Sequence, residues 1–326
     1  HAHFNRGRVL QLVARKEEAL RAYEQALALD PDRIDALINR ATLLHQSLRH
    51  GEALESLARA RTLQPDHTTA LVNTGLILLD LGRAQEALEI FDRILAHHPD
   101  HREALVSRGA SLLDLQRPGD ALAHYGRIEP RLQSAEALLN RGVALHQLGR
   151  HPEALASYDA ALRIRPEFAV AHSNRIFLLD YLPDLDFTQH QAERAAYCRI
   201  QTRALPPPGQ DHPNLRDPDR RLVVGYVSAD FRHHSAAACF GPVLLRHDRN
   251  AFKVVCYSGV LAEDDWTRTF QERADLWRVT AALSDEDLAE QIRRDAVDIL
   301  VDLSGHSKGN RLLVFARKPA PIQVTA

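Results

Sequence analysis

Small and large apolar residues recur along the first half of the chain at a nearly constant interval. The small residues are Ala19, Ala53, Ala87, Ala121 and Ala154, separated by 34, 34, 34 and 33 residues. Four positions after each alanine stands a large apolar residue, namely Tyr23, Leu57, Phe91, Tyr125 or Tyr158. Residues four apart share one face of a helix. The pattern therefore predicts the same amphipathic helix in every unit.

Other recurring residues indicate a second helix in each unit. Gly82 and Gly149 are expected to end that helix in a left-handed turn, which glycine adopts without strain. A proline recurs near the end of most units and is expected to open the next helix, where its missing N–H costs nothing. These prolines are Pro31, Pro65, Pro99 and Pro166. The fourth unit differs, with Pro118 in its turn and Pro130 near its end, so it is either distorted or short of one residue.

A 34-residue unit of two helices is the tetratricopeptide pattern. Residues 1–178 are therefore predicted to form an α-solenoid of about five units, with a sixth beginning near Val170. Such arrays present an extended concave face, and on fold alone they favour a generic docking scaffold.

A polar position recurs in the first helix of each unit. Asparagine is unfavourable inside a helix, so its repetition indicates a compensating contact. An amide both donates and accepts, so a row of amides on the concave face could hold an extended polypeptide by its main chain. The alternative is that each amide bonds to the neighbouring unit. The positions are Asn5, Asn39, Asn73, Asn140 and Asn174, with Ser107 in the fourth unit.

The periodicity fades after the repeats, and residues 179–220 read as a junction. A helix is expected over residues 189–203, and the Pro-Pro-Pro-Gly run at 206–209 marks a boundary. Residues 221–326 then alternate short apolar segments with helical ones. This alternation predicts a mostly parallel, Rossmann-like sheet. The expected strands are 222–228, 252–257, 276–279, 297–303 and 321–325, and the expected helices are 284–294 and 310–317.

Composition narrows the function classes. The formal net charge is −2, which gives no electrostatic support to nucleic-acid binding. No apolar run is long enough for a membrane helix. The three cysteines, Cys198, Cys239 and Cys256, are scattered. They predict neither disulfides nor a zinc site, and they fit a reducing compartment such as the cytoplasm.

Two loops follow predicted strands at the edge where ligands gather in such sheets. The first, residues 228–238, contains His233, His234 and Ser235, and its histidines could supply a general base or a hydrogen bond to a reacting hydroxyl. The alternative is that they are ordinary loop histidines. The Asp-x-Asp triplets at 184–186 and 217–219 lie in the junction and are expected to be solvated turns, so no metal is predicted.

The second loop, residues 304–311, is suited to an anionic or polar ligand. Gly305 and Gly309 permit close backbone approach, and Lys308 and Arg311 add positive charge ahead of a helix N-terminus. His306 lies between the two glycines. The alternative is a turn with surface cations.

These segments resemble one family. Residues 221–231, His234, residues 252–257, the loop at 305–311 and the stretch 317–323 are similar to O-linked N-acetylglucosamine transferases, as is the asparagine series. The resemblance implies a two-lobed, GT-B type, inverting glycosyltransferase that moves N-acetylglucosamine from UDP-GlcNAc to Ser or Thr hydroxyls of proteins without a metal. Residues 221–326 would be its N-terminal Rossmann-like lobe, and the C-terminal lobe, with most UDP contacts, is not in this chain.

The resemblance also assigns roles and partners. His234 matches the family's active-site histidine, and His233, Ser235, Gly305, His306, Lys308 and Arg311 are expected around the donor cleft. The asparagines match the groove that holds acceptor proteins, and a homodimer is compatible with the family. The form looks bacterial, with a short array, and Leu276 or Trp277 stands near the place of a second histidine of animal members. His306 stands where animal enzymes have a tyrosine. A non-catalytic repeat scaffold, or a transferase for another sugar or acceptor, remains the alternative.

Overall fold

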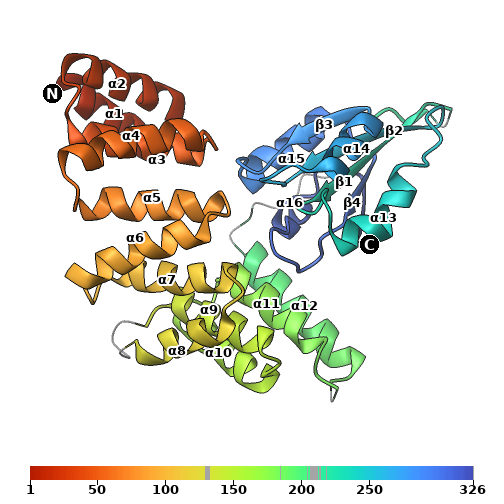
Figure 1. The fold of residues 1–326 in the computed structure, drawn as a ribbon. Helices are drawn as coiled ribbons and strands as arrows, with labels where there is room; N and C mark the ends of the chain where they lie inside the picture. Colours follow the sequence, from red (N-terminus) through yellow and green to blue (C-terminus); the bar gives the residue numbers. More distant parts are fainter. Residues whose placement is uncertain are drawn as a thin grey trace. The chain divides into compact units, whose positions relative to one another are not determined.

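The computed structural model describes residues 1–128, 133–183, 185–203, 205, 212, 214–217 and 219–325. These residues form two compact units, His1–Ser157 and Tyr158–Ala326. Figure 1 shows the order of the elements along the chain.

The first unit is built from pairs of antiparallel helices of similar length, each pair corresponding to one predicted repeat. The predicted helical repeat is thereby confirmed over this unit. Its helices are α1 (Ala2–Leu12), α2 (Lys16–Leu29), α3 (Ile34–Gln46), α4 (His50–Leu63), α5 (Thr68–Asp80), α6 (Ala84–His97), α7 (Arg102–Asp114), α8 (Pro118–Arg127), α9 (Ala135–Gln147) and the first half of α10 (His151–Ile164).

The recurring apolar residues pack as their sizes require. The repeat alanines are fully buried, as are Tyr23 and Phe91. Each of these rings lies directly on a glycine of the first helix of its unit: a Cβ placed on Gly7 would come within 2.7 Å of Tyr23, and one on Gly75 within 2.5 Å of Phe91. Close approach of the two helices therefore depends on a missing side chain on one helix as well as on the small alanine of the other.

Two details of the turns differ from expectation. The repeat prolines Pro31, Pro65, Pro99 and Pro166 lie in turns a few residues before the next helix begins, so the prediction that they open a helix was wrong. Pro118 does occupy the first turn of α8, while Pro130 lies outside the described residues. Gly82 and Gly149 both have φ of +72°, as predicted for a left-handed turn.

The second unit begins with helices and continues into a five-stranded sheet. Its helical part comprises the end of α10, α11 (Ala169–Leu179) and α12 (Phe187–Thr202). The sheet has the order β3-β2-β1-β4-β5, and every neighbouring pair is parallel. The strands are β1 (Leu222–Ser228), β2 (Phe252–Ser258), β3 (Leu276–Val279), β4 (Ile299–Asp302) and β5 (Ile322–Thr325).

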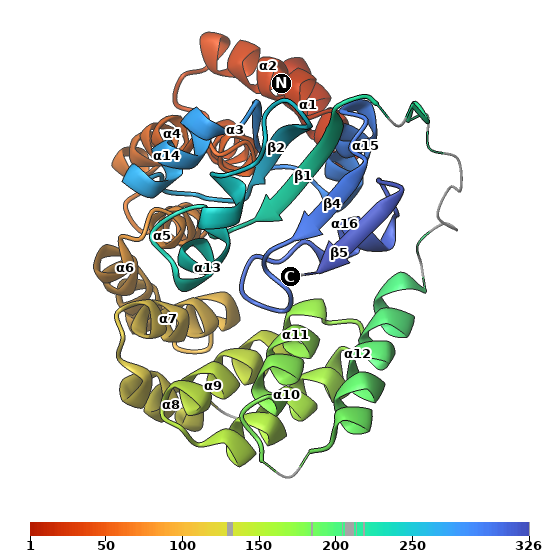
Figure 2. The same ribbon diagram turned by 90° about the vertical axis from the view of Figure 1, so that its right-hand side faces the viewer.

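Helices cover both faces of this sheet (Figure 2). On one face, α13 (Ser235–Leu244) and α14 (Asp265–Arg273) bury Leu244 and Phe270 against β1 and β2. On the other, α15 (Asp285–Arg294) and α16 (Leu312–Ala316) bury Ile292 and Val314. Strands buried on both faces read as continuous apolar runs, which is why they were recognisable in the sequence. The predicted Rossmann-like arrangement is confirmed.

Two helices of the second unit were not predicted. The expected loop at 228–238 ends earlier, because α13 begins at Ser235. This helix contains Pro242, a residue that argues against a helix interior. The other, α14, is mostly polar and is held at its start by a capping box of Asp264 and Thr267.

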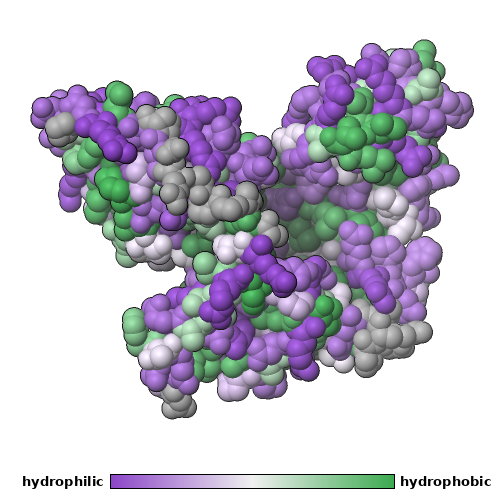
Figure 3. Space-filling model, turned by 180° about the vertical axis from the view of Figure 1, so that it is seen from behind, coloured by the Kyte–Doolittle hydropathy of each residue, from purple (hydrophilic) through white to green (hydrophobic). Residues whose placement is uncertain are grey.

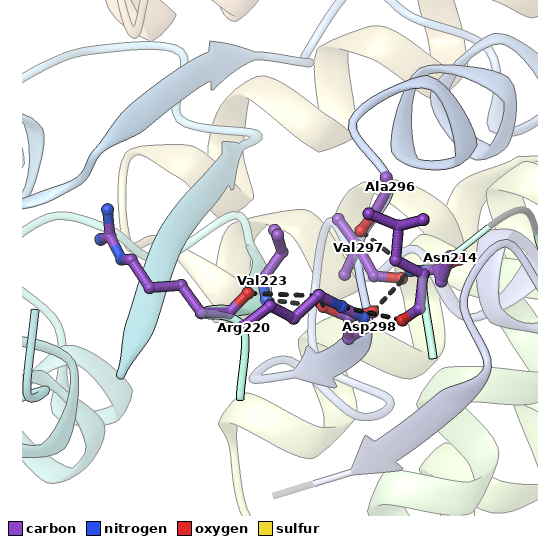
Figure 4. Close-up of polar contacts among 8 residues, drawn as sticks. Asn214, Arg220, Val223, Ala296, Val297 and Asp298 are labelled. Atoms are coloured by element: carbon purple, nitrogen blue, oxygen red, sulfur yellow. Dashed lines mark hydrogen bonds and ion pairs between the residues drawn. The ribbon is translucent and has the colours of Figure 1, made fainter. Parts of the chain in front are cut away.

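A buried carboxylate ties the junction to the sheet (Figure 4). Asp298, just before β4, accepts two hydrogen bonds from the Arg220 guanidinium, at 2.7 and 2.5 Å. It also accepts from the amide of Asn214 at 2.7 Å and from the backbone N–H of Val223 at 2.8 Å. The Asp298 side chain is 7% exposed. Four donors on one carboxylate therefore fix the chain that leads into β1.

Polar side chains cover most of the surface in Figure 3, with small apolar patches between them. The exposed apolar residues include Val9 and Leu12 of α1 and Val13, which follows this helix. Among the described residues, no helix combines the length and apolarity needed to span a bilayer.

Candidate functional site

The loops that follow β1 and β4 leave the same edge of the sheet. The two strands are neighbours, with Val227 opposite Asp302 in register. The loops also touch, because a Cβ added to Gly309 would lie 2.8 Å from the Cβ of Ala229, and Gly309 has φ of +82°. The structure therefore brings the His234 segment and the Lys308 segment together at the carboxyl edge, where open α/β sheets bind ligands.

His234 is held in a defined orientation at the N-terminus of α13. Its Nδ1 accepts a hydrogen bond from the backbone N–H of Ala236 at 3.2 Å and lies 3.8 Å from a carboxylate oxygen of Asp230. In the neutral ring, a proton must then reside on Nε2. His234 is 37% exposed, so it presents an N–H donor to a ligand at this edge.

The neighbouring residues tie the β1 loop to the next loop of the sheet. The backbone N–H of His233 donates to Asp264 at 2.7 Å, and its ring meets Trp266 edge-on at 5.2 Å. The His233 N–H is also the main reason that the pKa of Asp264 is lowered. Ser235 is exposed in the first turn of α13. Thus His233 contributes its backbone to the framework, and its exposed ring packs against Trp266.

The β4 loop is built on a buried carboxylate. Asp302 is fully buried, and its oxygens accept the backbone N–H groups of Ser304 and Gly305, both at 3.0 Å. Burial is the largest influence on this group and raises the pKa of Asp302. Gly305 has φ of +53°, and Asn310 closes the loop by donating to the carbonyl of Ser307. These bonds give the loop a fixed shape.

Two predicted cleft residues have partners within the second unit. Nδ1 of His306 lies 3.2 Å from the hydroxyl of Ser173 on α11. The guanidinium of Arg311 donates to the carbonyls of Thr280 and Leu283, at 3.3 and 2.6 Å, and burial lowers the pKa of Arg311. Both side chains therefore brace the loop, a role that the sequence did not suggest.

Lys308, unlike His306 and Arg311, is not held by a partner in the described part of the fold. It is exposed at the tip of the loop, with no hydrogen bond or ion pair to the described residues. Its ammonium group is the cation of this segment most available to an anionic ligand. In the described part of the chain no group of three His, Cys, Asp or Glu side chains is placed to hold a metal ion.

The asparagine series makes contacts between units. Asn39, Asn140 and Asn174 hydrogen-bond Tyr23, Tyr125 and Tyr158 of the preceding units, and the amide of Asn73 donates to Thr42 at 3.1 Å. These four asparagines are half-buried, and Asn5 is exposed. An amide has two donor hydrogens and two acceptor lone pairs. One bond to a neighbouring unit leaves capacity for a ligand, so both roles considered for these residues are compatible with the geometry.

Sequence reasoning overlooked the acidic residues of this site. Asp230 follows β1 by two residues, Asp302 ends β4 and Asp264 caps α14. Each accepts backbone N–H groups or lies beside His234. For Asp230 and Asp302, the available signal was their place just after a strand or at its end, where a carboxylate can shape the following loop.

Comparison with known proteins shows which families the two parts of the chain resemble. Residues 181–326 match glycosyl transferase family 41, and tetratricopeptide repeat families match residues 1–33, 46–99, 72–133 and 135–168. A protein from Oryza sativa subsp. japonica, named probable UDP-N-acetylglucosamine–peptide N-acetylglucosaminyltransferase SPINDLY, is 37% identical over 174 residues. The match covers 52% of this chain and 19% of that protein. The SPINDLY protein of Arabidopsis thaliana is 35% identical over 168 residues, covering 50% and 18%.

Solved structures show the same two similarities, to an O-GlcNAc transferase and to a tetratricopeptide repeat protein. A mutant O-GlcNAc transferase from Thermobaculum terrenum has a TM-score of 0.59 and 30% identity, covering 90% of this chain and 50% of that one. A tetratricopeptide repeat protein from Parabacteroides merdae, 20% identical with a TM-score of 0.52, covers 63% of this chain and 80% of its own, and shares the fold. The chain spans half of the solved transferase and about a fifth of the plant relatives.

These matches confirm the predicted resemblance to O-linked N-acetylglucosamine transferases. They also show that the α/β region is similar to that of known glycosyltransferases.

Proposed function

We propose that this chain, whose residues 181–326 match glycosyl transferase family 41, is part of an enzyme that transfers N-acetylglucosamine from UDP-GlcNAc to Ser or Thr hydroxyls of proteins. The observation that carries the proposal is the meeting of two loops at one sheet edge. One presents His234 and the other presents Lys308, and they touch through Gly309 and Ala229.

The loop that carries Lys308 would bind the negatively charged donor. A UDP leaving group carries negative charge that grows as the bond to the sugar breaks, and the exposed Lys308 ammonium would stabilise it. The turn at Gly305 and Gly309 lets the donor approach the backbone. Donor contacts beyond these residues are expected from the half of the solved relative that this chain does not cover.

His234 would act next to the acceptor hydroxyl or the sugar. An inverting transfer is a single displacement, in which the hydroxyl attacks the anomeric carbon and loses its proton to a base. With Nδ1 bonded to the Ala236 N–H, the neutral ring offers a donor at Nε2. In this arrangement His234 orients an oxygen of the substrate, and it could accept the proton only after giving up the Ala236 bond.

The repeats would bind the acceptor polypeptide. Asn39, Asn73 and Asn140 each use one hydrogen bond within the array and retain further amide capacity for a main chain. This contact is independent of side-chain sequence, which suits a transferase with many protein acceptors.

The proposal predicts that His234→Ala lowers kcat for transfer by the complete protein about 100-fold or more, because a positioned hydrogen-bonding group at the reacting oxygen is lost. The measurement is transfer of labelled N-acetylglucosamine to a protein acceptor, with donor binding measured by calorimetry. His98→Ala, an exposed histidine of the repeats, serves as the control.

Unchanged turnover of the His234→Ala variant would remove this residue from the chemistry. Absence of UDP binding by the complete wild-type protein would favour the scaffold alternative, and UDP binding without transfer from UDP-GlcNAc would favour another sugar.

A further inference from the structure

The β4 loop is joined to the helical part of the second unit by one histidine. Nδ1 of His306 lies 3.2 Å from the hydroxyl of Ser173 on α11. The same ring meets the face of Tyr197 on α12 edge-on, with centroids 4.9 Å apart. Ser173 and Tyr197 are both buried, at 3% and 7% exposure. The middle of the loop is therefore packed against two helices, through one polar and one aromatic contact.

The partner of His306 sits next to the last asparagine of the polar series. Ser173 directly precedes Asn174, and Asn174 hydrogen-bonds Tyr158 on the preceding helix, α10. Two consecutive residues of α11 thus face two different elements. One holds the neighbouring repeat helix, and the other holds the loop of the sheet.

The other side chains that anchor the loop by hydrogen bonds lie at its ends, and Gly309 packs on Ala229. Asp302 holds its start through the N–H groups of Ser304 and Gly305. Arg311 holds its end through the carbonyls of Thr280 and Leu283. Lys308 lies between these ends, two residues after His306 and exposed. His306 is the anchor nearest to Lys308 on the side of the helices.

We infer that His306 is a positioning residue: through Ser173 and Tyr197 it couples the last helices of the repeat series to the loop that presents Lys308. The catalytic consequence of this coupling rests on the proposed function, but the coupling itself does not. Without the His306 contacts, the loop would keep its ends and lose the fixed direction of its exposed lysine.

The environment of the ring supports a neutral imidazole. Burial is the main cause that lowers the pKa of His306 to about 4, Arg194 of α12 adds to this effect and Asp180 opposes it. A neutral ring can share a single hydrogen with the Ser173 hydroxyl in either direction.

Amide hydrogen exchange on the full chain tests the coupling directly. His306→Ala should speed exchange of residues 303–311 about fivefold or more, whereas exchange in α13 stays the same. Ser173→Ala and His306→Phe each remove the hydrogen bond and keep the Tyr197 contact, so each should give a smaller increase confined to this loop. The double variant should be no faster than either single one, because both remove the same bond.

The hydrogen-exchange measurement and its control do not depend on sugar-transfer activity. His98→Ala should leave the exchange of residues 303–311 at the wild-type rate. The inference fails if the loop exchanges at the wild-type rate in both His306→Ala and Ser173→Ala, or if the effects of Ser173→Ala and His306→Phe simply add. In the complete protein, the inference also expects His306→Ala to raise the donor KM more than it lowers kcat. A wild-type protein that transfers no sugar would defeat the proposed function and leave the exchange result standing.

Discussion

Histidine side chains of the second unit differ in role because their immediate partners differ. His234 is partly exposed at a helix N-terminus, with one ring nitrogen bonded to the backbone and the other able to reach a ligand. His306 is enclosed by Ser173 and Tyr197 and acts inside the fold. Both histidines were recognisable in the sequence, but only packing distinguishes the one that can touch a substrate from the one that holds a loop.

Residue size has an equally direct effect in the repeats. A Cβ on Gly75 would lie 2.5 Å from the ring of Phe91, which is fully buried. We therefore expect Gly75→Ala to lower the free energy of unfolding by about 1–3 kcal/mol, despite the better helix propensity of alanine. Denaturant unfolding followed by circular dichroism measures it.

The matched control is Gly51→Ala, in α4, where nothing lies within 4 Å of the added Cβ. This change should be neutral or stabilise the protein by up to about 1 kcal/mol. Equal effects of the two substitutions would show that the Gly75–Phe91 contact is not tight.

At the scale of elements, the strands and the repeat helices were predictable because each has a simple apolar period. Strand β1 was predicted at its observed bounds, and the helix predicted over 284–294 is α15, with Ser284 as its N-cap. The helices α13 and α14 were missed because Pro242 and a polar surface hide the helical period, while tertiary contacts and Asp264 supply the stability. Ion pairs that recur between units, such as Arg59 with Asp32 and Arg93 with Asp66, join residues 27 apart, a spacing that marks no single element.

The junction before β1 depends on Asp298, and this gives a pH prediction. Burial, the largest influence, would raise the pKa of Asp298, but Arg220, the Val223 N–H and Asn214 together outweigh it, so the pKa is lowered. As pH falls below about 4, the unfolded chain therefore takes up a proton before the folded chain does. The stabilisation from Asp298 should be complete above that pH and decline below it.

Asp298→Asn should accordingly destabilise the protein by about 2–4 kcal/mol at pH 7, with a difference from wild type that shrinks as the solution is acidified toward pH 3. Urea unfolding across this range measures the difference. Asp265→Asn, which alters an exposed pair with Arg268, should change stability by less than about 0.5 kcal/mol. A difference independent of pH would contradict the assigned ion pair.

At the scale of the whole molecule, the fold class followed from the sequence, and so did the place of two loops at one edge of the sheet, because strand ends and repeats are local features. The partners of Arg311 and His306 did not, since Thr280, Leu283, Ser173 and Tyr197 reach the loop only through the tertiary fold. The contacts of the asparagines were likewise ambiguous, because burial between units and exposure to a ligand leave the same sequence pattern.

We propose that amides of the repeats hold an acceptor polypeptide for a sugar transferase. The most direct measurement compares transfer to a long peptide acceptor with donor hydrolysis, in the complete protein and in a variant with Asn39, Asn73 and Asn140 replaced by Ala. We predict at least a tenfold loss of kcat/KM for the long acceptor, from several lost hydrogen bonds of about 1 kcal/mol each, with unchanged donor hydrolysis. Equal loss of both activities, or no loss of either, would contradict the account.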